Sequence, residues 1–391
     1  MMMKIINNII LKGIKMVLHT YYTRGLCSTC YRELGANVEY RSDGAAYITK
    51  ICPEHGYEEA MVEKDYDFWH NALQTNPDNK TWNEYNHVTI IEATDRCNVQ
   101  CKHCYHMPDN DIPDLPAETI IARALAAPTS GVVLMGAEPT MRKDLIDIIK
   151  EIKKRPAAIP KINVNIYTNG IKLRDPDYVN ELIEANLNSV CMSIHNPDYH
   201  QSVIWDKVST ALTNVAKSKL LLGQVSFTVE NKDQVRHAVD KMIWLKKHDS
   251  LPNDFCVRSP AKIGLEFEQE REIFASEIFQ WLSEIAQEKN LSFTKHPNYG
   301  SNPYHVGTLL DGNIPIQVIH WGTAKSVDTS YMYMGPWASF IPHTYGTFLI
   351  QSILREGWKK GWWQGQRLVP ETKQIYTQNI STKKIIMENL T

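Results

Sequence analysis

The sequence lacks any run of uncharged apolar residues that approaches the ~18–20 positions needed to span a membrane. Its apolar start, residues 1–19, is interrupted by Lys4, Lys12 and Lys15, and no small-residue cleavage site follows it. These features argue against a signal peptide, and Met16 is an equally acceptable first residue. We therefore expect a cytoplasmic protein with no membrane span.

The chain also lacks an excess of charge of either sign. Its 42 Lys and Arg residues are balanced by 44 Asp and Glu residues, which gives a formal net charge of −2. Such a balance does not draw a protein to nucleic acid or to an anionic membrane, so we expect no nucleic-acid partner. The 391 residues, 43% of them hydrophobic, suffice for two or three domains or for one barrel-sized domain with appendages.

Cysteine is scarce in the second half of the chain. After Cys104 only Cys191 and Cys256 remain, far apart, so we expect no additional iron–sulfur cluster. The eight cysteines include two groups with the spacing of metal ligands, in a chain that is not a short secreted one. Metal binding in a reducing compartment explains them better than disulfides.

Short apolar runs alternate with amphipathic helical patterns between residues 88 and 264. The predicted strands are Val88–Thr94, Gly131–Met135, Lys161–Tyr167, Ser189–Ile194, Gln224–Val229 and Phe255–Arg258. The predicted helices are Glu118–Ala127, Lys143–Arg155, Asp177–Ala185, Lys207–Leu220 and Gln234–His248. Consecutive apolar positions in the strands are typical of a parallel sheet covered by helices. Six such steps are too few for a closed eight-stranded barrel, so we predict the α/β class with a partial (β/α)6 TIM-type barrel.

The flanking segments complete a three-part organisation. We expect a small N-terminal Cys/His metal-binding module at residues 17–62, the barrel at residues 87–264, and a C-terminal α+β extension at residues 265–391. A polar and aromatic connector runs from Asp65 to His87. The extension begins with a helix over Glu268–Lys289 and continues into a hairpin.

The hairpin is expected to turn at Asp311-Gly312, between the runs Gly307–Leu310 and Ile314–His320. The residues that follow are rich in Trp, Tyr and Gly. They either close the open side of the barrel and line an apolar substrate pocket, or simply pack against it.

The segment after the first barrel strand carries Cys97, Cys101 and Cys104 in the spacing C-x3-C-x2-C. Three thiolates can bind three irons of a cubane cluster and leave the fourth iron open to a substrate or cofactor. On spacing alone, a structural zinc ion with His103 or His106 as fourth ligand is an equal alternative. The place at the carboxyl end of a strand, where α/β barrels position their chemistry, favours the cluster.

These features resemble the radical S-adenosylmethionine (SAM) superfamily over roughly residues 87–264. The cysteines match its C-x3-C-x-Φ-C signature, with His103 in the aromatic slot and Tyr105 directly after the last cysteine. The second strand runs into Gly136-Ala137-Glu138-Pro139, which resembles the family's G-G-E-P motif with Ala137 in place of the second glycine. The resemblance implies that this segment contacts the methionine amine of SAM, Glu138 by charge-assisted hydrogen bonds.

The resemblance places further cofactor contacts at the ends of later strands. The third strand ends in Thr168-Asn169-Gly170, similar to the family's T-N-G, and the fourth ends in Ser193-Ile194-His195. By the same placement, Thr228, Glu230 and Arg258 end the fifth and sixth strands. For these polar residues, capping of the next helix is the alternative role.

The resemblance also implies a mechanism. The amine and carboxylate of SAM chelate the open iron of a [4Fe–4S] cluster, for which Cys97, Cys101 and Cys104 are the expected ligands and catalytic residues. One electron, supplied by a donor such as ferredoxin or flavodoxin, then breaks a sulfur–carbon bond to give methionine and a 5′-deoxyadenosyl radical. The protein orients the reactants and excludes water and oxygen.

The N-terminal module carries Cys27 and Cys30 as C-x2-C, and Cys52 and His55 as C-x2-H. Two short knuckles separated by a hairpin-sized insert are a common way to build a tetrahedral metal site. Zinc is the first expectation, a single rubredoxin-type iron is the second, and four unligated residues are the remaining alternative.

Such a module ahead of a radical domain resembles the subgroup that contains the archaeal pterin-methylating enzyme and the tetraether lipid synthase. Those proteins share C-x2-C followed by C-P-x-H-G, as at Cys52–Gly56 here. The resemblance implies functionalisation of an unactivated carbon, by methylation or carbon–carbon bond formation, in a small-molecule or lipid-like substrate.

Several alternatives stay open on the sequence. Cys191 and Cys256 are either small buried residues or thiols that face the barrel and donate hydrogen atoms. The chain could instead modify a peptide or protein side chain, with residues 27–56 docking the partner. A non-catalytic adaptor with about two zinc ions per chain is the alternative from a different class.

Overall fold

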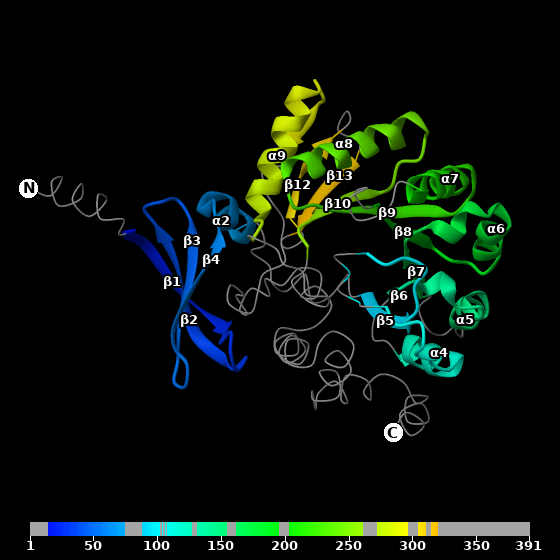
Figure 1. The fold of residues 1–391 in the computed structure, drawn as a ribbon, viewed down its shortest axis with the longest axis horizontal. Coiled ribbons are helices and arrows are strands. Elements are labelled where there is room, and N and C mark those ends of the chain that lie inside the picture. Colours follow the sequence, from blue (N-terminus) through cyan, green and yellow to red (C-terminus); the bar gives the residue numbers. More distant parts are fainter. Residues whose placement is uncertain are drawn as a thin grey trace, which may run out of the picture.

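Figure 1 shows the computed structural model of the chain. It describes residues 15–74, 88–101, 104, 106, 108–126, 131–154, 162–194, 203–260, 272–295, 304–309 and 314–319. The described strands form one sheet of four strands and one of nine. None of the described helices is long and apolar enough to cross a membrane.

The N-terminal sheet is an antiparallel meander in chain order. Its strands are β1 (Val17–Leu26), β2 (Glu33–Arg41), β3 (Ala46–Cys52) and β4 (Gly56–Glu63). The β3–β4 turn begins at Cys52, which pairs with Gly56, and Gly56 has the positive φ of +81° that favours glycine. The hairpin thus brings both metal knuckles toward one end of the sheet.

The larger sheet contains the barrel strands in the order in which they occur along the chain. These strands are β5 (Val88–Thr94), β6 (Gly131–Gly136), β7 (Asn163–Thr168), β8 (Ser189–Ser193), β9 (Leu221–Thr228) and β10 (Asp254–Arg258). Each is parallel to its neighbour. The intervening α-helices are α4 (Ala117–Ala126), α5 (Leu145–Lys153), α6 (Pro176–Glu184), α7 (Val203–Lys217) and α8 (Lys232–Lys247). The predicted α/β class with a partial barrel is confirmed.

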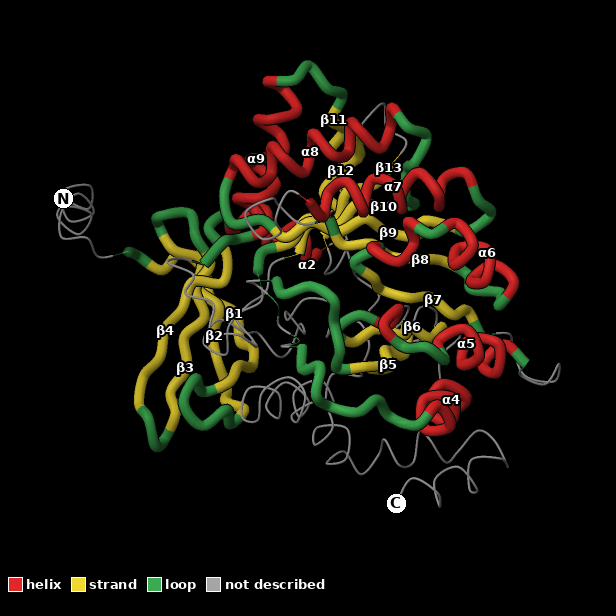
Figure 2. The backbone as a smooth tube through the Cα atoms, turned by 45° about the vertical axis from the view of Figure 1, so that its right-hand side comes forward, coloured by secondary structure: helices red, strands yellow, loops and turns green. Residues whose placement is uncertain are grey.

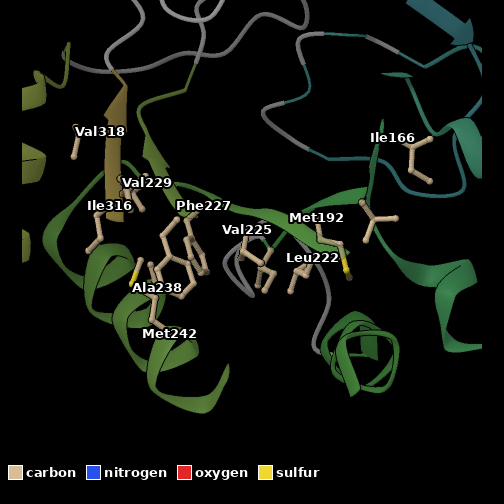
Figure 3. Close-up of a cluster of buried hydrophobic side chains, with 14 of the residues drawn as sticks. Ile166, Met192, Leu222, Val225, Phe227, Val229, Ala238, Met242, Ile316 and Val318 are labelled. Atoms are coloured by element: carbon tan, nitrogen blue, oxygen red, sulfur yellow. The ribbon is translucent and has the colours of Figure 1, made fainter. Parts of the chain in front are cut away.

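The two faces of this sheet differ in chemistry. Figures 1 and 2 show the helices α4 to α8 on its outer side. Apolar side chains such as Ile166, Val225 and Phe227 point from the strands toward these helices and form the core (Figure 3). Alternate residues such as Tyr167 and Gln224 therefore lie on the opposite, concave face, because successive side chains of a strand alternate between faces.

The predicted C-terminal hairpin is present as β12 (Tyr304–Leu309) and β13 (Ile314–Ile319). Both strands continue the barrel sheet, since β13 pairs in parallel with β10, and β11 (Phe293–Lys295) pairs with β12. The helix before them, α9 (Ala275–Glu288), begins later than predicted: residues 272–274 are not helical and Phe274 is its N-cap. The predicted turn at Asp311-Gly312 lies outside the described residues.

The connector after the N-terminal sheet contains a helix that the sequence pattern did not predict. This helix is α2 (Tyr66–Gln74), whose Phe68 and Trp69 are buried in the core. Phe68 packs against Phe279 of α9 with ring centroids 5.5 Å apart. Packing against α9 thus stabilises a helix that local composition alone did not reveal.

Polar contacts also join the N-terminal sheet to α9. Buried Glu63, at the end of β4, accepts hydrogen bonds from the hydroxyl of Ser276 and, at 3.3 Å, from its backbone N–H. Lys64 forms an ion pair with Glu277 at 2.7 Å. The small sheet is therefore anchored to the helix that precedes β11.

Candidate active site and metal site

The three cysteines of the C-x3-C-x2-C segment lie in the loop directly after β5. Cys97 is fixed by its backbone N–H, which donates to Asn110 Oδ1 at 3.0 Å, and Cys104 N donates to the carbonyl of Cys101 at 3.1 Å. All three side chains are half-buried. The loop thus holds the thiols at the carboxyl end of the sheet.

The loop after β6 is bonded to the start of the cysteine loop. Ala137 N donates to the carbonyl of Thr94, and Glu138 N donates to that of Arg96, both at 3.0 Å. Gly136 has a φ of +134°, and a Cβ on it would overlap the Thr94 carbonyl oxygen. The close approach of these two backbones therefore requires glycine at position 136.

Glu138 is completely enclosed and its carboxylate accepts four hydrogen bonds from the chain. Oε1 accepts from the backbone N–H of Thr140 at 3.1 Å, from its hydroxyl at 2.6 Å, and from the hydroxyl of Thr168 at 2.7 Å. Oε2 accepts from the backbone N–H of Asn169 at 2.7 Å. Pro139 begins the short 3₁₀ turn η1 (Pro139–Met141) for which Glu138 is the N-cap. The carboxylate therefore ties the end of β6 to the end of β7.

Asn169 connects this network to the cysteines. Its amide Nδ2 donates to Asn98 Oδ1 at 2.8 Å and lies 4.0 Å from Cys97 Sγ. Its Oδ1 accepts from Ile171 N at 3.0 Å, which fixes the side chain. The ends of β5, β6 and β7 are thus joined through Asn169 and Glu138.

A second set of polar contacts stabilises the ends of the cysteine loop. Arg96 and Thr94 both bond to Asp114, which also lies after the loop. Buried Arg142 donates from Nη1 to the carbonyl oxygens of Ala93 and Leu115, at 2.8 and 2.9 Å. Sequence reasoning missed Asp114 and Arg142, because neither belongs to a motif and both act on distant backbone.

The thiols fit a cationic cluster chemically. Burial, the Glu138 carboxylate and the Cys104 thiol raise the pKa of Cys97 to about 11. Burial together with Cys104, Cys97 and Glu138 also raises the pKa of Cys101. When the three cysteines bind iron, their thiols are deprotonated and lie near the Glu138 carboxylate, which makes four negative groups. The positive charge of a bound iron–sulfur cluster would compensate them.

His106, one of the two histidines offered as a fourth zinc ligand, does not support the zinc alternative for this triplet. Buried His106 lies between Glu92 and Asp95, with its ring nitrogens 3.3 and 3.4 Å from their carboxylate oxygens. Both nitrogens therefore face carboxylates. His103 lies outside the described residues, as do the predicted cofactor contacts Tyr105 and His195.

Some of the polar residues at the ends of β8, β9 and β10 bond one another across the strands, whereas one bonds within the turn that begins the next helix. The Ser193 and Ser226 hydroxyls are 3.1 Å apart, and Arg258 Nε donates to the Thr228 hydroxyl at 3.4 Å. Glu230 instead uses its backbone N–H to bond Gln234 Oε1 at 2.8 Å, in the turn that begins α8. The structure therefore brings Ser193, Thr228 and Arg258 onto the concave face and places Glu230 at a helix start.

Cys191 and Cys256 lie on the concave face of β8 and β10. Burial raises the pKa of each thiol to about 12, and each thiol is also affected by the nearby Asp254 carboxylate. Tyr167 lies level with Cys191 on the neighbouring strand and partly offsets the effect of burial on the pKa of that thiol. Both thiols are thus neutral at ordinary pH. All eight cysteines, which all lie among the described residues, are free.

The N-terminal cysteines and histidine form a compact metal site. The ligand atoms of Cys27, Cys30, Cys52 and His55 all lie within 4.8 Å of one another. Two of the sulfurs are 3.9 Å apart, and His55 Nδ1 lies 3.4 and 3.5 Å from Cys52 and Cys27 Sγ. A tetrahedral zinc ion would separate two sulfurs by about 3.8 Å and a sulfur from a nitrogen by about 3.5 Å, given its usual bond lengths. These three distances match those of a tetrahedral zinc site.

Glu58 supports this site, and sequence reasoning missed it. Its carboxylate accepts from Ser28 N at 3.0 Å, from Ser28 Oγ at 2.6 Å and from Cys27 Sγ at 3.8 Å. Buried Lys50 lies 3.8 Å away, directly opposite Glu58 in the β3–β4 hairpin. The sequence did contain a signal for this pair. If Cys52 pairs with Gly56 at the hairpin turn, then Lys50 and Glu58, each two residues farther from the turn, lie opposite one another.

Two family models match the parts of the chain that contain these two groups of residues. The family model of the radical SAM superfamily matches residues 91–219, and that of the HMPTM N-terminal zinc ribbon domain matches residues 19–64. The chain is 28% identical over 240 residues to the 7,8-dihydro-6-hydroxymethylpterin dimethyltransferase of Methanocaldococcus jannaschii, covering 54% of this chain and 44% of that protein. It is 29% identical over 165 residues to the probable GTP 3′,8-cyclase of Thermoplasma volcanium, covering 38% and 48%.

The matches thus span about half the length of these relatives. Among solved structures, Streptococcus suis SuiB bound to S-adenosylmethionine superposes with a TM-score of 0.45 at 14% identity, covering 67% of this chain and 57% of that chain. This likeness is loose and supports no conclusion about function.

The predicted resemblance to the pterin-methylating subgroup is confirmed by the zinc ribbon match and by the dimethyltransferase relative. The prediction of an enzyme is also confirmed, because both the matched domain and these relatives are those of enzymes. The chain carries a radical SAM domain, which binds a [4Fe–4S] cluster and SAM, behind an N-terminal zinc ribbon.

Proposed function

We propose that this chain is a radical SAM enzyme that functionalises an unactivated carbon of a polar small molecule, by methylation or carbon–carbon bond formation. The observation that carries the proposal is the network of Glu138 and Asn169, which joins the cysteine loop to the ends of β6 and β7. This network lies at the carboxyl end of a sheet whose concave face carries polar side chains.

The chain's own residues position the reactants. When bound, the cluster supplies the electron that splits SAM into methionine and a 5′-deoxyadenosyl radical. Cys97, Cys101 and Cys104 would hold it. The backbone from Gly136 to Pro139 and the side chain of Asn169 lie beside these cysteines and would bind the cofactor's polar groups. Ser193 and Thr228 would extend that contact along β8 and β9.

Glu138 acts in this proposal as a positioning residue. All four hydrogen bonds that its carboxylate accepts among the described residues come from Thr140, Thr168 and Asn169. The SAM amine would therefore be met by backbone carbonyl groups of the loop that Glu138 holds in place. The remaining predicted contacts, His103, Tyr105, His195 and Glu230, stay predictions from the sequence.

The concave face favours a polar substrate over a lipid-like one. Among the described residues Arg258 uses only its Nε group, to bond Thr228, so an acyl chain would leave its other guanidinium N–H groups without an acceptor, which is costly in a desolvated site. The two curated relatives are named for a pterin and for GTP, both compounds with polar, nitrogen-rich fused rings. We therefore propose a substrate of that general kind for this chain.

The test is anaerobic analysis of iron, sulfide and zinc, with an assay for 5′-deoxyadenosine after addition of dithionite and SAM. We expect about four iron, matching sulfide, one zinc, and release of the nucleoside. Zinc alone, without sulfide or nucleoside, would contradict the proposal and leave a zinc-binding adaptor.

Two variants separate the two metal sites. Cys101→Ala should lose iron, sulfide and nucleoside formation but retain zinc, whereas Cys30→Ala should lose zinc and retain cluster assembly. Cys256→Ser, outside both ligand sets, is the matched control and should retain both metals. Nucleoside release by Cys101→Ala would show that the ligand assignment is wrong.

A further inference from the structure

The concave face of β7 to β10 forms a continuous polar surface. Its members alternate with the apolar residues that face the helices. They are Asn165 and Tyr167 on β7, Ser189, Cys191 and Ser193 on β8, Gln224, Ser226 and Thr228 on β9, and Asp254, Cys256 and Arg258 on β10. We call this set the polar face.

The polar face spans four neighbouring parallel strands of the sheet. Strands β7 and β10 are three strands apart, about 14 Å in a flat sheet. Burial raises the pKa of the Tyr167 phenol on β7, so this side chain is neutral on the polar face.

Arg258 is the one cationic side chain among the residues of the polar face. It is half-buried at the carboxyl end of β10, and its Nε donates to the hydroxyl of Thr228 at 3.4 Å. Within the described part of the chain its guanidinium has no carboxylate partner. The carboxyl group of Asp254, on the same strand, accepts instead from Gln224 Nε2 at 2.7 Å.

Among the described residues, this arrangement leaves four guanidinium N–H donors of Arg258 without an acceptor, beside a pair of hydroxyl groups. The Ser193 and Ser226 hydroxyls are 3.1 Å apart. Ser226 precedes Thr228 by two residues on β9, so this pair lies next to the paired residues Thr228 and Arg258 on the same face. A guanidinium binds carboxylate and phosphate oxygens through parallel hydrogen bonds. Hydroxyl groups nearby can donate to the remaining oxygens.

We infer that Arg258 binds an anionic oxygen group, a carboxylate or a phosphate, of the polar substrate, with Ser226 and Thr228 beside it. This inference rests on the proposed function, since it concerns the substrate of the same site. It assigns Arg258 to the substrate, whereas the resemblance of the sequence had placed it among the cofactor contacts. β10 lies five strands from β5, after which the cysteine loop begins.

The experiment uses the anaerobic, metal-loaded protein in the presence of SAM but without reductant, so that binding is measured without turnover. Two matched pairs of probes isolate the anionic group: pterin-6-carboxylate against 6-hydroxymethylpterin for a carboxylate, and GMP against guanosine for a phosphate. Equilibrium dissociation constants are measured by ligand fluorescence for the pterins and by calorimetry for the nucleosides. The dissociation constant of SAM is measured in parallel.

We expect the wild-type protein to bind one charged probe at least tenfold more tightly than its neutral partner. Arg258→Met should weaken the charged probe tenfold or more, change the neutral probe less than twofold, and leave SAM affinity unchanged. Arg258→Lys should retain part of the preference because it keeps the charge. Arg174→Met, on the exposed 3₁₀ turn η2 (Ile171–Arg174), is the control and should match the wild type.

Three results would overturn the inference. Loss of SAM affinity with unchanged probe binding would show that Arg258 serves the cofactor. Equal weakening of charged and neutral probes would show a structural role, which circular dichroism and zinc content would also reveal. Absence of a charge preference in the wild type would show that the substrate carries no such anion. Release of 5′-deoxyadenosine by the wild-type protein is a separate measurement, and its absence would refute the proposed function instead.

Discussion

The backbone N–H of Asn169 donates to Glu138 Oε2 across 2.7 Å, so that the turn after β7 rests on a carboxylate supplied by the loop after β6. Glu138→Gln keeps the shape of the side chain but replaces one acceptor oxygen with an NH2 donor. That donor would face either Asn169 N–H or the donors of Thr140 and Thr168, and the turn would have to shift.

We expect Glu138→Gln to weaken equilibrium binding of SAM about tenfold, or about 1.4 kcal/mol. Iron and zinc contents should be unchanged, because no metal ligand is altered. Glu151→Gln on the exposed side of α5 provides the control. Wild-type SAM affinity in Glu138→Gln would mean that the turn does not depend on the charge of this carboxylate.

Gly136 and Gly44 allow backbone strain to be separated from steric overlap. Both have positive φ values, +134° and +86°, but a Cβ on Gly44 would meet nothing within 4 Å. Gly44→Ala should therefore cost only the conformational penalty, about 1 kcal/mol of unfolding free energy. Gly136→Ala adds the overlap with the Thr94 carbonyl and should cost clearly more, measured by urea denaturation. If both variants lose the same unfolding free energy, the loops after β5 and β6 can move apart to accept the added Cβ at no energetic cost.

Arg142 is expected to stabilise the fold beneath the cysteine loop. Arg142→Met leaves the Ala93 and Leu115 carbonyl oxygens without their donor, and the first of these bonds is buried. Leaving a buried acceptor unsatisfied costs about 1–3 kcal/mol, so we expect a loss of that size in unfolding free energy. Arg236→Met, which removes exposed ion pairs with Asp233 and Glu288, should cost less than about 1 kcal/mol. A reversed order of the two losses would contradict this assignment.

Asp254 should give the chain a measurable pH dependence. Burial raises the pKa of its carboxyl group above the usual value of 3.8, an effect that the hydrogen bond from Gln224 partly offsets. The folded state therefore holds this proton more tightly than the unfolded state. Stability relative to Asp254→Asn should fall as pH rises from about 3.8 through the raised pKa, and then stay constant.

The measurement is the difference in unfolding free energy between the wild type and Asp254→Asn at a series of pH values. The introduced side-chain amide retains an acceptor oxygen for the Gln224 Nε2 group, so the hydrogen bond of 2.7 Å is preserved in kind. Protonation of the zinc ligands at low pH destabilises both proteins equally, so its effect cancels in the difference between their unfolding free energies. A difference that is flat with pH would show that Asp254 titrates normally.

The barrel core was predictable from the sequence because its strands are short apolar runs and its helices have clear amphipathic periods. Predicted Val88–Thr94 coincides with β5, and Asp177–Ala185 differs from α6 by one residue at each end. Strand β1 was not predicted, since its first four residues are exposed and show no apolar alternation. Helix α2 was missed for a related reason: its burial depends on α9, which lies some two hundred residues later in the chain.

The site was predictable wherever a motif fixed the residue types. The spacing at Cys27, Cys30, Cys52 and His55 predicted a metal site that the structure assembles with zinc-like distances. No motif could reveal that Glu138 is enclosed by chain donors, or that Arg258 lacks a carboxylate partner among the described residues. These properties depend on which strands become neighbours and therefore on the complete fold.

The separation of the two faces of β7 to β10 has a consequence for how such proteins diversify. Side chains that face the helices, such as Val225 and Phe227, hold the domain together, while Gln224 and Ser226 between them do not contribute to that core. Substitutions at the second set leave the apolar packing of that core unchanged. A lineage can therefore alter the lining of the concave side by single replacements while the core that holds the domain together stays intact.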